Sequence, residues 1–143
     1  MSVIATNDDR ISFGAGFEKV QPIHRERLAI VYVRQSTLQQ VVHHQESTRL
    51  QYGLRGQAER MGWAPDRILV IDDDLGVSGS TAEGRAGFQR LLAEVALEHV
   101  GIIFGVEISR LSRSCRDWYQ LLQLCAVFRT LICDLEGLYD PAL

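Results

Sequence analysis

Short apolar runs alternate with helical patterns along most of this 143-residue chain, and this alternation narrows the possible folds more than any other feature. The apolar runs are rich in Val, Ile and Leu, as buried strands are, and they lie at residues 28–34, 67–72, 100–106 and 130–135. The helical stretches carry apolar residues at three- and four-residue spacings, and they lie at residues 37–61, 86–97 and 112–128. The order β-α-β-α-β-α-β predicts an α/β fold with a parallel sheet of four or five strands and helices on both faces.

Residues 1–27 lack this periodicity, and we expect them to be an N-terminal tail or arm before a single domain at 28–143. The helical stretch at 37–61 has a possible break near His43 and His44, where Ser47 could cap a second segment. Gly62 then ends this stretch in the manner typical of a helix C-terminus.

The composition indicates an ordinary soluble protein, since 46% of the residues are hydrophobic and no apolar run approaches the roughly 18 residues that span a bilayer. The N-terminus has no secretory signal pattern, and the three cysteines lack metal-ligand spacing, so reduced thiols and a cytoplasmic location are expected. The net charge of −3 argues weakly against a stand-alone DNA binder. However, 14 of the 15 basic residues are Arg, the side chain best suited to bidentate phosphate contact.

Polar side chains with phosphate-binding character follow the predicted strands. Ser36 comes just after the first strand, and Arg34 lies two residues earlier, on the same side of an extended chain. Arg110 and Arg113 follow the third strand and lie three residues apart at the start of a helix, while Arg85 begins another helix. Ligands of parallel sheets bind beyond the carboxyl ends of the strands, so these five residues should gather at one edge, with Ser36 exposed.

A hydroxyl beside several arginines suits attack on a phosphodiester, because a guanidinium binds two phosphate oxygens at once and stays charged. Each residue alone also has an ordinary structural explanation. Ser36 could be a turn or cap residue, and the arginines could belong to solvated helix ends.

Three segments resemble the motifs of the serine recombinases, the resolvase/invertase superfamily. Tyr32-Val-Arg-Gln-Ser-Thr37, with Gln40 after it, is similar to the family's nucleophile motif. Gly76-Val-Ser-Gly79 followed by Arg85-Ala-Gly-Phe88 is similar to the second motif, and Ser109-Arg-Leu-Ser-Arg113 to the arginine motif. The resemblance covers about residues 28–141 and implies a resolvase-like, flavodoxin-like three-layer catalytic domain of a large serine recombinase of a mobile element.

The resemblance also implies roles for individual residues. Ser36 would attack the scissile DNA phosphate, and the arginines at 34, 85, 110 and 113 would hold the phosphate and stabilise the transition state without a cofactor or metal. Tyr32, Gln40 and Ser109 would position the site. Ser109 stands where the family has an aspartate, and the general base for Ser36 is not assigned.

The expected function is therefore site-specific recombination of double-stranded DNA through a covalent 5′-phosphoserine, with dimers or tetramers formed by the full-length protein. Without the family's dimerising helix and DNA-binding part, the 143-residue chain is expected to be a monomer or weak dimer that binds DNA weakly. Two alternatives stay open: a phosphatase- or esterase-like hydrolase on the same fold, and a non-catalytic assembly module.

Overall fold

The computed structural model describes residues 19–33, 45–73, 86–106, 108, 115–134 and 137–142, without the side chains of residues 45–48 and 50. These residues contain a five-stranded sheet in the order β2-β1-β3-β4-β5. The strands are β1 (Leu28–Tyr32), β2 (Ile68–Ile71), β3 (Val100–Phe104), β4 (Leu131–Asp134) and β5 (Gly137–Tyr139). The first four are parallel, and β5 pairs with β4 in the antiparallel direction.

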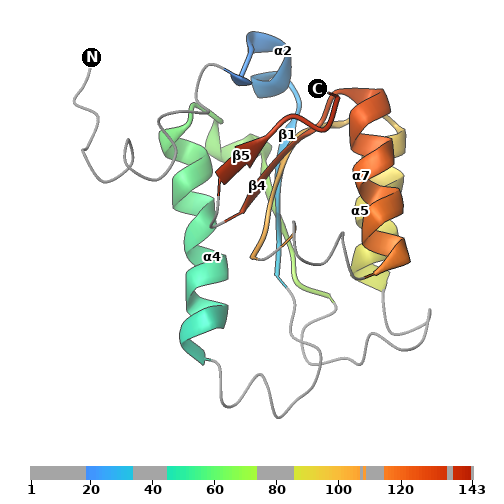
Figure 1. Cartoon of the computed structure of the whole chain (residues 1–143). Helices are drawn as coiled ribbons and strands as arrows, with labels where there is room; N and C mark the ends of the chain where they lie inside the picture. The colour runs from blue at the N-terminus through green and yellow to red at the C-terminus, as the bar shows by residue number, and fades with distance from the viewer. Residues whose placement is uncertain are drawn as a thin grey trace.

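Helices cover both faces of the sheet, as the sequence predicted (Figure 1). Helix α4 (Gln45–Arg60) packs on one face, and helices α5 (Ala86–Ala96) and α7 (Arg116–Phe128) pack on the other. Successive residues of β1 divide between the two cores: Val31 belongs to the α4 side, and Ile30 and Tyr32 belong to the α5 and α7 side. Both faces of β1 are buried, and this explains why its sequence is continuously apolar rather than alternating.

The four predicted strands are all present, and none of their ends differs from the prediction by more than two residues. The fifth strand, β5, was not located in the sequence, because three residues with one buried side chain, Leu138, give little pattern to detect. Helix α7 begins at Arg116 after an extended Cys115, so this cysteine lies outside the helix. The helical expectation for residues 37–44 and 112–114 lies outside the described residues.

The described part of the expected N-terminal arm, residues 19–27, packs against the domain. It contains the short helix α2 (Pro22–Arg25) and contributes two buried side chains, Val20 and His24. The indole N–H of Trp63 donates to the His24 carbonyl at 3.2 Å. Gly101 of β3 lies so close to this carbonyl that any Cβ there would clash with it, so α2 can lie against β3 only because residue 101 has no side chain.

Candidate active-site edge

The carboxyl ends of three parallel strands meet at one edge of the sheet, drawn at the lower end of the strands in Figure 1. Tyr32 at the end of β1 is in register with Ile71 at the end of β2, and Val31 is in register with Phe104 at the end of β3. The pairing continues one residue further, where the Val33 N–H donates to the Ile71 carbonyl at 2.9 Å. The segments that carry the sequence motifs leave β1, β2 and β3 from this edge.

Tyr32 is the only predicted site residue among the described residues. Its side chain is 4% exposed and belongs to the core between the sheet and helices α5 and α7. The structure therefore places its ring in the protein interior beneath the edge. The positions of the other predicted residues stay predictions, because the following all lie outside the described residues: Arg34, Ser36, Gln40, Arg85, Ser109, Arg110 and Arg113.

An aromatic cluster joins the described residues nearest to the three motifs. The Tyr32 ring lies 6.3 Å from that of Phe88 and 5.5 Å from that of Trp118, and the Phe88 and Trp118 rings are 5.0 Å apart, all measured between centroids. Phe88 is the third residue of α5, and Trp118 is the third residue of α7. The cluster thus ties the end of β1 to the beginnings of both helices.

A second anchor holds the chain just before the arginine motif. Ile108 is 1% exposed and belongs to the same core as the aromatic cluster. Its side chain lies against Gly105. If residue 105 had a side chain, its Cβ would lie 2.8 Å from the Ile108 Cδ1, which is too close for two carbon atoms. Since Ile108 directly precedes Ser109 in the sequence, its burial fixes the point from which the motif starts.

A hydrogen bond that the sequence analysis missed connects α4 to the end of β2. The Tyr52 hydroxyl donates to the Asp72 carboxylate at 2.6 Å. This bond, followed by partial burial, raises the pKa of Tyr52 to about 12, so the phenol stays protonated at any working pH. The helical spacing of α4 gave no sign of the pair, since its two residues are 20 positions apart.

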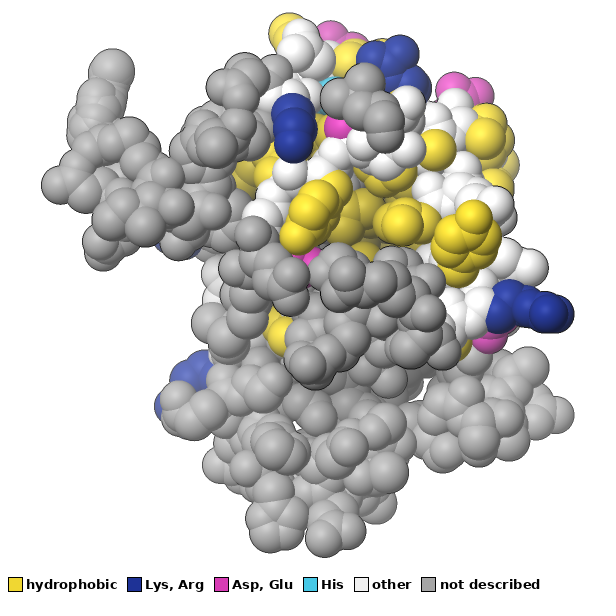
Figure 2. All heavy atoms as spheres, viewed as in Figure 1, with side chains coloured by type: hydrophobic (Ala, Val, Ile, Leu, Met, Phe, Trp, Pro, Cys, Tyr) yellow, Lys and Arg dark blue, Asp and Glu magenta, His cyan; other side chains and the backbone are white. Residues whose placement is uncertain are grey.

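The described residues show neither a basic patch on the face seen in Figure 2 nor a metal-binding cluster. The Lys and Arg side chains coloured in Figure 2 are scattered over the visible face and do not form a single patch. Among the described residues, no three His, Cys, Asp or Glu side chains come close enough to hold a metal ion. No described helix is long and apolar enough to cross a membrane.

The three cysteines are free thiols. Burial raises the pKa of both Cys125 and Cys133 to about 12, and the nearby Asp134 charge adds to the effect at Cys133. These two thiols therefore stay protonated and unreactive and serve as core packing residues.

The described residues form an α/β domain with a mostly parallel sheet, a fold class in which ligands bind beyond the carboxyl ends of the strands. Residues 29–140 match the family described as "Resolvase, N terminal domain". The chain therefore belongs to this family and is a serine recombinase catalytic domain.

One curated relative shares much of the sequence. The chain is 52% identical over 124 residues to the uncharacterized protein y4bA/y4pH of Sinorhizobium fredii. The matched part is 87% of this chain and 18% of that relative, so the chain spans less than a fifth of the relative's length.

Proposed function

We propose that this domain cuts and rejoins double-stranded DNA through a covalent phosphoserine, with Ser36 as the nucleophile. The aromatic cluster of Tyr32, Phe88 and Trp118 carries the proposal. Tyr32 begins the nucleophile motif, Phe88 ends the second motif, and Trp118 follows the arginine motif by five residues. Contacts among these three rings support a common location for the segments that bear the hydroxyl and the arginines.

In the proposed reaction, the Ser36 oxygen forms a bond to phosphorus while the bond from phosphorus to the 3′ oxygen breaks. The DNA keeps a 5′-phosphate joined to Ser36. The Ser36 hydroxyl gives up its proton as it attacks, and the 3′ oxygen takes up one proton and leaves as a hydroxyl, so protons balance over the step. Rejoining is the reverse reaction with the 3′-hydroxyl of a second strand, so the bond energy is retained and no nucleotide cofactor is required. Arg34, Arg85, Arg110 and Arg113 would stabilise the phosphate charge, while Gln40 and Ser109 would position the site.

The deciding experiment traps the covalent intermediate. It uses the full-length protein and double-stranded DNA that carries the protein's recombination site. Denaturing electrophoresis should show a protein–DNA adduct for the wild type and for Thr37→Ala, but none for Ser36→Ala. The Thr37 variant controls for the neighbouring hydroxyl. An adduct that survives Ser36→Ala would show that another residue is the nucleophile.

The same samples separate the alternatives. Turnover of a simple phosphomonoester without any DNA adduct would favour a hydrolase. Neither activity, in a protein that still binds DNA and self-associates, would favour a non-catalytic assembly module. The substitution of Ser109 for the family's aspartate is the sequence feature that favours this last alternative. Function on DNA as a dimer or tetramer in the cytoplasm is part of the same proposal.

A further inference from the structure

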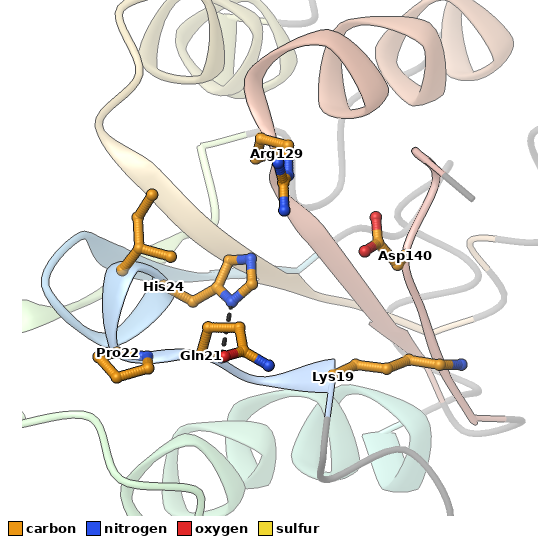
Figure 3. A pocket seen from close by; sticks show the side chains of 7 residues that line it. Lys19, Gln21, Pro22, His24, Arg129 and Asp140 are labelled. Carbon is orange, nitrogen blue, oxygen red and sulfur yellow. Dashed lines mark hydrogen bonds between the residues drawn. The ribbon is translucent and has the colours of Figure 1, made fainter.

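A pocket of about 640 Å3 lies near the end of the sheet where β1 and β3 begin, and Figure 3 shows the side chains that line it. Its walls come from α2 and the residues just before it, from the end of α7 and from the residue after β5. The chemically active side chains in the lining are Lys19, His24, Arg129 and Asp140. None of them belongs to a recombinase motif.

His24 supplies a fixed hydrogen-bond donor to this pocket. The Gln21 backbone N–H donates to the His24 Nδ1 at 2.9 Å. Because a nitrogen that accepts a hydrogen bond carries no proton, the proton of the neutral ring must lie on Nε2. The side chain is 2% exposed, and no acceptor for Nε2 is found among the described residues.

Two cations lie at the same pocket. The Arg129 guanidinium points toward the His24 ring in Figure 3, and no described carboxylate lies within ion-pair distance of it. The Arg129 backbone adopts the left-handed conformation with φ 61° at the end of α7, where its N–H donates to the Cys125 carbonyl. Lys19 donates one hydrogen bond to the Leu138 carbonyl at 3.0 Å and retains two further N–H groups.

Asp140 determines which anion suits this site. Its carboxylate lies on the side of the pocket opposite Gln21 and Pro22 in Figure 3 and accepts from the Ala142 N–H at 3.0 Å. A doubly charged phosphate would be repelled by it more strongly than a singly charged carboxylate. The Asp140 carboxylate can accept further hydrogen bonds besides the one from Ala142. It therefore suits a ligand that carries an N–H group next to its anionic group.

We propose that this pocket binds the carboxylate of an amino-acid derivative or peptide, held between the Arg129 guanidinium and the Nε2–H of His24. An amide N–H of the same ligand would donate to Asp140. The ligand is either a small acylated amino acid or a carboxylate-bearing residue of a polypeptide, since both present the same groups. The proposal is independent of the recombination chemistry.

The test is an NMR titration of the 15N-labelled 143-residue chain, with the His24 side-chain resonances as the reporter. The ring should show the Nε2–H tautomer before any ligand is added. N-acetylglycine should then shift the His24 signals in a saturable way, and acetate should do so more weakly. The neutral N-acetylglycinamide should have no effect, and phosphate should bind no more tightly than acetate.

Two variants test the named contacts. Arg129→Gln should weaken N-acetylglycine binding by about tenfold or more, as expected for loss of a charge-assisted hydrogen bond. Arg90→Gln, which removes an exposed arginine of α5 that does not line the pocket, should leave binding unchanged. His24→Asn retains an acceptor for the Gln21 N–H and removes the Nε2 donor, so it should also weaken binding.

Each of three results would overturn the proposal: an Nδ1–H tautomer, equal binding of N-acetylglycine and its amide, or equal affinity of the Arg129→Gln and Arg90→Gln variants. Should His24→Asn fail to fold, the comparison of the two arginine variants still decides. A peptide with a free terminal carboxylate, compared with N-acetylglycine, distinguishes the two sources. Tighter peptide binding indicates a polypeptide ligand and equal binding a small molecule, and both agree with the proposed chemistry.

Discussion

The rings of Tyr32 and Trp118 lie 5.5 Å apart between centroids, although they are 86 residues apart in the sequence. Tyr32 ends β1 and Trp118 lies in the first turn of α7, so this contact crosses from the sheet to a covering helix. Phe88 of α5 completes the cluster. The packing of these three aromatic side chains joins the end of β1 to the beginnings of α5 and α7.

Replacement of Trp118 by Ala should therefore destabilise the domain strongly. Trp118 is 5% exposed and contacts two other rings, and removal of a buried aromatic side chain costs about 3–5 kcal/mol. Urea unfolding followed by circular dichroism measures the loss. The neighbouring Tyr119→Ala, which removes a ring that is 53% exposed, is the control and should change stability by no more than about 0.5 kcal/mol. Similar losses in the two variants would show that the cluster does not support the fold.

Arg110→Lys should impair DNA cleavage if Arg110 contacts the scissile phosphate as proposed. A lysine retains the positive charge but presents a point charge in place of the planar guanidinium fork. Removal of one donor to a developing oxyanion typically lowers the rate by roughly a hundredfold or more. Single-turnover cleavage by the full-length protein measures the effect, and Arg90→Lys on the exposed surface of α5 serves as the matched control. Equal rates for the two variants would remove Arg110 from the site.

Gly101→Ala should destabilise the domain because its Cβ would clash with the His24 carbonyl oxygen. The obstacle is backbone, so α2 must move away from β3, at a cost of about 2–3 kcal/mol at the upper end of the range for overpacking. Gly53→Ala is the control: nothing lies within 4 Å of a Cβ built there, and in the interior of α4 alanine should stabilise by up to about 1 kcal/mol. Thermal unfolding should move the two variants in opposite directions, and a neutral Gly101→Ala would show that α2 can shift without loss.

The sequence was sufficient to predict the four parallel strands, among which β1 and β3 are buried on both faces and so appear as uninterrupted apolar runs. The three- and four-residue spacing of apolar residues also predicted the helices at 86–97 and 112–128, and the buried side chains of α5 and α7 include Phe88 and Trp118. The spacing of apolar residues along the sequence indicates which side chains are buried, and the strands and helices were predicted from that burial alone.

The spacing of apolar residues does not predict contacts between segments that are far apart in the sequence. The Tyr52–Asp72 hydrogen bond joins two residues that each resemble ordinary surface positions. The packing of α2 depends on the absence of a side chain at Gly101, which no pattern in residues 19–27 reveals. For the candidate site, the order of the strands predicted a common edge, and of the predicted side chains only Tyr32 lies within the described residues.

The stability of the domain should depend on pH through His24. Burial lowers the pKa of His24 below its ordinary value of 6.5, as do the charges of Arg27, Arg129 and Arg25, while the Asp140 charge opposes them. Protonation would also place a proton on Nδ1, where the Gln21 N–H now donates. The folded state therefore disfavours the charged ring.

The sign of the effect follows from linkage. Between the lowered pKa and 6.5, the unfolded chain binds a proton at His24 that the folded chain does not bind, so stability rises with pH in that window. The contribution of the neutral ring is fully present above pH 6.5 and is lost as the pH falls through the folded-state pKa. The wild type should thus lose stability relative to His24→Asn as the pH is lowered from about 7.5 to about 5.

The Asp140→Asn variant provides a second test of the pKa of His24. Because the Asp140 charge raises the pKa of His24, its removal should lower this pKa further and extend the pH-dependent window toward lower pH. An NMR titration of the His24 ring in the wild type and in Asp140→Asn measures the two midpoints directly. A midpoint at or above 6.5 in the wild type, or a higher midpoint in Asp140→Asn, would contradict the assignment of burial and Asp140 as opposing influences on this imidazole.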